Sequence, residues 1–290
     1  MQAEVKCYGC ILKKAEGLLE QSTLSEQNKL LRIKEILTLL GTAPEEQSAP
    51  VLMARAIDIV KQDTGEQDYY RSAKQKYNKI LLEKEAELEK TIAASSDPLH
   101  SALQIALIGN YIDFGAMDTV DPNKLEQLLA DWDTVFLAPE EYRRFREELQ
   151  TAERLVYCCD NAGEIVLDKL LIKEIKREYP GIHITVLVRG APILNDALWE
   201  DANAVGLAEY AEILDNGSHI PGTQIGELGT AAEQSLREAD LCIAKGQGNF
   251  ETLHGSGKNI YYLFLCKCDL FTKRFGVKQF TGFFCNERRL

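Results

Sequence analysis

From residue 154 onward, short apolar runs alternate with longer segments that have helical periodicity. The apolar runs, which we expect to be buried strands, cover residues 154–159, 183–188, 211–214, 241–244 and 260–266. The segments typical of helices lie at residues 164–179, 198–205 and 226–238. Strands that alternate with helices form a parallel sheet with crossover helices, so this half of the chain predicts an α/β fold.

The first 150 residues show a different pattern, in which apolar side chains recur at helical spacing. The predicted helices cover residues 24–40, 50–62, 69–91, 99–108 and 139–151, and another begins at Asp121-Pro122. Residues 43–46 (Ala-Pro-Glu-Glu) also resemble the start of a helix. The sequence therefore predicts a helical N-terminal domain, residues 1–150, followed by an α/β domain, residues 151–290.

The charge of the chain limits its partners. With 33 basic and 45 acidic residues the net charge is −12, which disfavours nucleic acids and anionic membranes. A small anionic metabolite is still possible, because one bound cation can reverse the sign of the potential inside a cleft. No segment approaches the ~20 apolar residues of a membrane span, and the first residues lack the pattern of a signal peptide. We therefore expect a cytoplasmic protein.

Polar side chains follow the first two predicted strands. Asp160 and Asn161 come directly after the first strand, and Asn195-Asp196 follow the second strand by a few residues. In open parallel sheets, ligands bind at the carboxyl ends of the strands, and carboxylate and amide oxygens suit a hard cation. Each pair also fits a simpler explanation, because Asp and Asn are common in turns and at helix N-caps. Arg189, at the end of the second strand, could hold a phosphate or pair with an acid.

The fourth predicted strand is followed by Lys245-Gly246-Gln247-Gly248-Asn249. Two glycines expose backbone N–H groups and the lysine adds a positive charge, so this segment could cradle phosphate oxygens. It is neither a Walker loop nor a dinucleotide fingerprint, because its glycine spacing fits neither pattern. The third strand ends in Asp215-Asn216-Gly217, which is above all a turn signal. Acidic strand ends and a Lys-Gly segment on one edge of the sheet together indicate a ligand-binding site more specifically than any one of them alone.

At these residues the sequence resembles a known family. The blocks at residues 160–164, 189–196 and 245–251 resemble, in the same order, those of the metal-dependent damage-control phosphatase family, formerly a domain of unknown function. Cys7-x-x-Cys10 and residues 109–115 resemble its compact microbial subgroup. The resemblance implies a helical region packed on a Rossmann-like, mostly parallel sheet with flanking helices. It also implies hydrolysis of small phosphate monoesters, such as sugar phosphates or damaged phosphometabolites.

The resemblance also assigns roles to residues. It implies that Asp160, Asn161 and Asp196 hold a divalent cation, for which we consider Mg²⁺, Mn²⁺, Co²⁺ and Ni²⁺. Such a cation would polarise a phosphoryl oxygen and position the attacking water. We expect Lys245 to neutralise a second oxygen, and Asp160 is our first choice for the base or nucleophile. The residues that we expect to hold the small phosphorylated metabolite are Asn110, Asp113, Glu164, Arg189, Gly246, Gly248 and Asn249.

Two other functions stay open at this point. Members of the family have been described as carboxyl methyltransferases, although no glycine-rich turn after the first strand favours a nucleoside cofactor. Alternatively, Cys7 and Cys10 could join Cys266 and Cys268 in a four-thiolate zinc site, which would suggest a non-catalytic thiol or metal-binding module. The simpler interpretation of these cysteines is buried thiols or a redox-sensitive pair.

Overall fold

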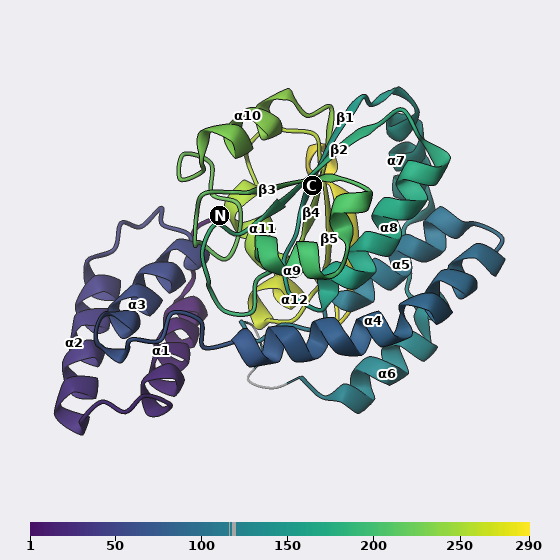
Figure 1. Cartoon of the computed structure of the whole chain (residues 1–290). Helices are drawn as coiled ribbons and strands as arrows, with labels where there is room; N and C mark the ends of the chain where they lie inside the picture. The colour runs from purple at the N-terminus through teal and green to yellow at the C-terminus, as the bar shows by residue number, and fades with distance from the viewer. Residues whose placement is uncertain (116, 118–119) are drawn as a thin grey trace.

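The computed structural model describes residues 1–115, 117 and 120–290, and it confirms the α/β class. One sheet with the strand order β3-β2-β1-β4-β5-β6 forms its centre (Figure 1). Strands β1 to β5 pair in parallel, and β6, which the sequence pattern did not predict, pairs antiparallel to β5. The strands are β1 (Arg154–Cys158), β2 (His183–Val188), β3 (Glu212–Asp215), β4 (Leu241–Lys245), β5 (Ile260–Leu265) and β6 (Gly282–Asn286).

The helices precede the sheet in the first half of the chain and connect its strands in the second half. Those of the first half are α1 (Val5–Glu20), α2 (Glu26–Thr42), α3 (Ala49–Thr64), α4 (Arg71–Ala94), α5 (Pro98–Gly109), α6 (Pro122–Ala130) and α7 (Pro139–Thr151). Those of the second half are α8 (Glu164–Glu178), α9 (Trp199–Ala204), α10 (Thr230–Glu238), α11 (Gly246–Leu253) and α12 (Asp269–Phe275). None of the helices in the described ranges is long and apolar enough to cross a membrane.

Alternate side chains of the strands enter two different cores, as the pleat of a sheet requires. In β1, Leu155 and Tyr157 pack with α4, α5 and α8 on one face, where the largest core lies. Val156 and Cys158 face the opposite side, which α10, α11 and α12 cover. The sheet is thus the middle of three layers (Figure 1).

Helices α1, α2 and α3 form a separate small core at one side of the sheet, drawn in purple in Figure 1. Three side chains from the loops after β2 and β3 complete that core: Ile193, Leu194 and Ile220. Helices α4 to α7, in contrast, contribute to the same core as β1 and α8. The change at residue 150 is therefore a change in secondary structure within one packed core, and the division into domains 1–150 and 151–290 stays a prediction.

Several helices differ from the prediction, and α11 and α12 are absent from it. Residues 43–46 do not start a helix: α2 ends at Thr42, and α3 begins at Ala49, with a proline in its first turn where no N–H is required. Helix α10 begins at Thr230 rather than at residue 226. Helix α1 was not predicted, although its buried residues Ile11, Ala15, Leu18 and Leu19 have helical spacing.

Candidate active site

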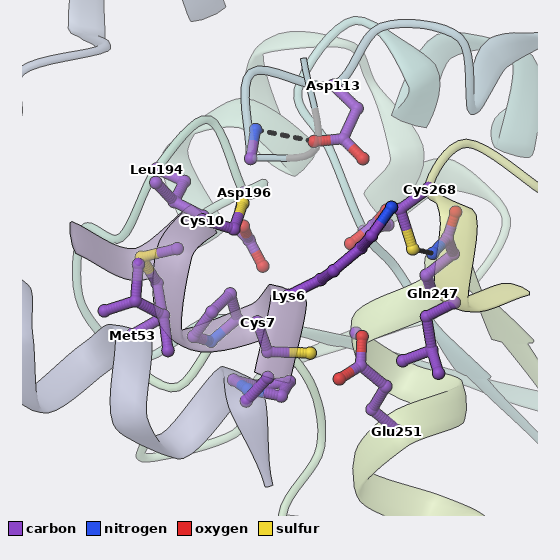
Figure 2. A pocket seen from close by; sticks show the side chains of 18 of the residues that line it. Lys6, Cys7, Cys10, Met53, Asp113, Leu194, Asp196, Gln247, Glu251 and Cys268 are labelled. Carbon is purple, nitrogen blue, oxygen red and sulfur yellow. Dashed lines mark hydrogen bonds between the residues drawn. The ribbon is translucent and has the colours of Figure 1, made fainter. Parts of the chain in front are cut away.

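A cavity of about 350 Å³ lies over the carboxyl ends of β1 and β4. These two strands form the point where the chain order of the sheet reverses, which is where open α/β sheets usually bind ligands. Asp160, Asn161 and Asp196 line the cavity from the sheet side, and we call these three residues the acidic floor. Helices α1 and α3 line the other side with Lys6, Cys7, Cys10, Ile11, Ala49, Pro50 and Met53 (Figure 2).

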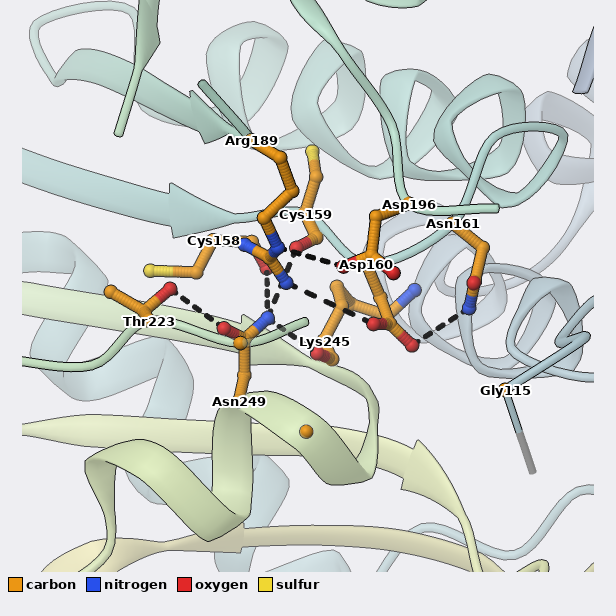
Figure 3. A network of polar contacts seen from close by, with 12 residues as sticks. Gly115, Cys158, Cys159, Asp160, Asn161, Arg189, Asp196, Thr223, Lys245 and Asn249 are labelled. Atoms are coloured by element: carbon orange, nitrogen blue, oxygen red, sulfur yellow. Dashed lines mark hydrogen bonds and ion pairs between the residues drawn. The ribbon is translucent and has the colours of Figure 1, made fainter. Parts of the chain in front are cut away.

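The ends of β1 and β2 bring the acidic floor together. The Ala197 N–H donates to the main-chain oxygen of Asp160 at 2.8 Å, and Asn161 forms a β-bridge with Asp196. Arg189 Nε donates to Asp196 Oδ2 at 2.7 Å, and its Nη2 lies 4.0 Å from Asp160 Oδ1 (Figure 3). The two aspartates therefore lie close enough to contact one guanidinium, and their role as metal ligands stays a prediction.

Two amides orient the Asp160 carboxylate. Asn161 Nδ2 and Asn110 Nδ2 donate to Asp160 Oδ2 at 2.7 Å and 3.0 Å. Asn110 also donates to Glu164 and accepts from the Leu265 N–H at 3.0 Å. Asn110 is fully buried and does not line the cavity, so it supports Asp160 rather than holding the substrate as expected. Because Oδ2 takes both amides, Oδ1 is the Asp160 oxygen left for a cation or a substrate.

The acidic floor carries more negative charge than its surroundings compensate. Burial raises the pKa of Asp160 well above its usual value, and the neighbouring carboxylates of Glu164, Asp196 and Asp113 raise it further. Burial also raises the pKa of Asp196, although Arg189 opposes that shift. No group of three or more His, Cys, Asp or Glu side chains within the described ranges is arranged to hold a metal. The two carboxylates and one carboxamide of the floor nevertheless fit a hard divalent cation, which would offset their charge.

Gly246, the first residue of α11, allows Asp160 to occupy its position. Its φ is +78°, and a Cβ there would lie only 1.9 Å from Asp160 Oδ2. We expect Gly246→Ala to lower activity about a hundred-fold, because a displacement of roughly 1 Å at a reacting site can cost that much. Initial rates of phosphate release, the reaction that the resemblance implies, measure the effect.

Gly255→Ala is the matched control for Gly246→Ala. Gly255 also has a positive φ, +86°, but a Cβ at this residue would meet nothing within 4 Å. Both variants carry the same backbone strain, roughly 1–2 kcal/mol, and only one of them presses on Asp160. Equal losses of activity in the two variants would show that contact with Asp160 is unimportant.

Lys245 lies beneath the site and not across from the floor. Its ammonium donates to Glu164 Oε1 at 2.7 Å, to Asp168 Oδ1 at 2.5 Å and to the Ala106 carbonyl at 2.8 Å. These bonds use its three protons, the side chain is fully buried, and Lys245 does not line the cavity. This differs from the expected contact between Lys245 and a phosphate oxygen. Asp168, which sequence reasoning missed, lies one turn after Glu164 on the buried face of α8.

Several residues that we expected to hold the substrate also have internal partners. Arg189 and Glu164 are buried and pair with Asp196 and Lys245, and neither lines the cavity. The Asn249 amide is fully buried and donates to the carbonyls of the β1 and β4 ends, so it closes the turn rather than facing a ligand. Gly248 does line the cavity.

Asp113 lines the cavity as expected, and its partner is Lys267, which sequence reasoning missed. Lys267 Nζ donates to Asp113 Oδ2 at 2.5 Å, and its charge opposes the rise in the pKa of Asp160. Lys267 follows β5. Its place at the carboxyl end of a fifth parallel strand was the sequence signal that could have identified it. The buried cation on the Asp113 side of the site is thus Lys267 and not Lys245.

The cysteines do not form the four-thiolate site. Cys7, Cys10 and Cys268 line the cavity, but Cys266 is buried in the core on the α10–α12 face of the sheet. Burial is the main reason why the pKa of Cys7 rises to about 11, so its thiol stays protonated at neutral pH. The alternative of a four-thiolate zinc site therefore has no counterpart among the residues that the structure describes.

Comparison with known proteins assigns the fold and the family. A family model described as the damage-control phosphatase ARMT1-like domain matches residues 3–281. The chain belongs to the damage-control phosphatase family. A protein named damage-control phosphatase from Archaeoglobus fulgidus is 31% identical over 285 residues, which cover 96% of each chain. This supports a phosphatase function at the level of the family and confirms the resemblance seen in the sequence.

Two further matches extend over nearly the whole chain. An uncharacterised protein from Methanocaldococcus jannaschii is 31% identical over 94% of this chain and 91% of its own length. The crystal structure of a protein of the same family, from Pyrococcus horikoshii, superimposes with a TM-score of 0.84 over 99% of both chains. Its sequence identity is 24%, so the superposition supports the damage-control phosphatase fold alone.

Proposed function

We propose that this damage-control phosphatase hydrolyses small phosphate monoesters and needs a divalent cation held by Asp160, Asn161 and Asp196. The observation that carries the proposal is the acidic floor, where two buried carboxylates and an amide face one cavity of about 350 Å³. That volume suits a small metabolite. The cytoplasmic location expected from the sequence stays a prediction.

The bound cation would polarise a phosphoryl oxygen and favour attack by water. The residues of the chain prepare the site for this reaction. Arg189 holds the Asp196 carboxylate in place through the bond from Nε, and Asn110 and Asn161 fix one oxygen of Asp160. Such preorganisation matters because phosphate monoesters hydrolyse extremely slowly without a catalyst, so charge stabilisation must supply much of the rate. Asp160 remains our first choice for the base or nucleophile, through its Oδ1 atom.

The test is a panel of phosphate esters assayed with chelator-treated protein. We expect phosphate release only after addition of Mg²⁺, Mn²⁺, Co²⁺ or Ni²⁺, because without a cation the acidic floor repels the phosphate. Binding of the metal alone should raise the melting temperature, since a ligand that binds only the folded state stabilises it. Undiminished phosphate release in the presence of chelator would contradict the proposal.

A further inference from the structure

One carboxylate in the cavity has no role in the acidic floor. Glu251 lies on α11 and points into the cavity from the side of Cys7 and Cys268 (Figure 2). Its Oε2 atom is buried and accepts no hydrogen bond within the described part of the chain. A buried carboxylate oxygen without a partner is costly, so a ligand that fills this space should supply a donor.

Among the described residues, no strong donor pairs with Glu251 Oε2. Gln247 donates its amide to Cys268 Sγ at 3.2 Å, and Lys6 pairs with Asp269 at the rim of the cavity. The N-terminal ammonium donates to the main-chain oxygen of Glu251 and not to its carboxylate. Elsewhere the cavity is lined in part by side chains that donate no hydrogen bonds, namely Ile11, Met53, Leu194 and Leu270.

The electrostatics at Glu251 favour a cationic donor. Burial raises the pKa of Glu251 to about 7, and the N-terminal ammonium only partly opposes this shift. An ammonium group on a ligand would stabilise the ionised carboxylate, because charge-assisted hydrogen bonds are the stronger ones. A ligand that ended in a methyl group would instead displace water from the carboxylate without supplying a hydrogen bond in its place.

Helix α11 connects the position of Glu251 with the acidic floor. Gly246 touches Asp160 at the start of this helix, and Glu251 follows five residues later in the same helix. At 1.5 Å per residue, the two positions are separated by roughly 7.5 Å along the helix axis. A linker of a few carbon atoms between a phosphate on the floor and a donor at Glu251 spans such a distance.

We propose that Glu251 is a specificity-determining residue, which selects phosphate monoesters whose alcohol portion ends in an ammonium group a few carbons from the phosphate. This inference rests on the proposed phosphatase function and goes beyond it, because it names the chemistry of the leaving group. A terminal hydroxyl is the second-best donor, and a terminal methyl group is the poorest match.

The test uses alkyl phosphates of three to five carbons that end in an ammonium, hydroxyl or methyl group, assayed with the metal-loaded enzyme. In wild type we expect kcat/KM for the best ammonium ester to exceed that of the methyl ester of equal length by about 10–100-fold. In Glu251→Gln, the kcat/KM values for the ammonium and hydroxyl esters should lie within a few-fold of each other. In Glu251→Leu, kcat/KM should be highest for the methyl ester. Ratios within one variant cancel any difference in the folded fraction.

Asp269→Asn is the matched control, because Asp269 is another acid at the same cavity but is exposed and paired with Lys6. It should keep the ammonium preference. An equal loss of preference in Asp269→Asn would show that only the overall charge of the cavity matters. Equal rates for all three ester types in wild type, or hydrolysis of other esters but none of these, would overturn the role of Glu251. Failure to hydrolyse any phosphate ester with any of the metals would instead refute the proposed function.

Discussion

Asp160→Asn should lower phosphate release roughly a thousand-fold or more, which corresponds to about 4 kcal/mol of transition-state stabilisation. The substitution keeps the size of the side chain and one acceptor oxygen for the amides of Asn110 and Asn161. It removes the negative charge of the carboxylate that we propose as a metal ligand. The metal-dependent rise in melting temperature should therefore disappear as well. Phosphate release and thermal unfolding, each with and without metal, measure both effects.

The same variant should not be unstable in the absence of metal. Asp160 is buried among the carboxylates of Glu164, Asp196 and Asp113, so a neutral side chain relieves repulsion in the metal-free protein. We expect its melting temperature in chelator to equal or exceed that of wild type. Asp215→Asn, at the exposed end of β3, is the control. It should change neither the rate of phosphate release nor the melting temperature. Full activity of Asp160→Asn would eliminate Asp160 as a metal ligand.

Lys245→Met should destabilise the protein by about 3–5 kcal/mol, because it leaves two buried carboxylates without their cation. Lys245, Glu164 and Asp168 have fully buried side chains. Burial alone would lower the pKa of Lys245, but Asp168 and Glu164 reverse this and raise it. The contribution of Lys245 to stability is therefore present below the unfolded-state pKa, ~10.4, and is lost only as the pH rises through the higher folded-state pKa. Urea unfolding of Lys245→Met at neutral pH measures the loss in the free energy of unfolding.

Lys79→Met provides the comparison for Lys245→Met. Lys79 is exposed and lies 4.0 Å from Glu83, and a surface pair of this kind contributes at most about 1 kcal/mol. A second variant, in which Asp168→Asn accompanies Lys245→Met, should recover part of the lost stability because it removes one of the unpaired charges. If Lys245→Met cost no more than Lys79→Met, the buried ion pairs would not stabilise the fold.

The position of the acidic floor at one edge of the sheet could be predicted because it follows from strand topology. Once β1 and β2 are recognised as neighbouring parallel strands, the residues after them must meet at one edge of the sheet. Asp160 and Asp196 needed no information beyond that pattern and the family resemblance. To predict the role of Lys245, one also needs the direction in which its side chain points. Ile243, two residues earlier in β4, faces the α4–α5–α8 core, so strand alternation directs Lys245 to the same face.

Other features could not be obtained from strand ends. The segment after β4 is the first turn of α11 rather than a loop, so the position of Glu251 depends on the phase of a helix that the sequence pattern did not indicate. The partners of Asn110 lie at least 50 residues away along the chain, and only tertiary packing brings them together. Hydrophobic periodicity carries no information on such long-range polar contacts.

The separate core of α1, α2 and α3 has a consequence for how this enzyme can change. Two of these helices face the cavity. Among the described residues, the buried core that the three helices share contains loop side chains beyond β2 and β3, but no buried side chain of β1 or β4. Substitutions in this three-helix unit can therefore alter which leaving groups enter while the machinery for the phosphate stays intact. The cavity wall that these helices supply can therefore diverge independently of the phosphate site, whereas Glu251 shares α11 with Gly246 and is tied to that site.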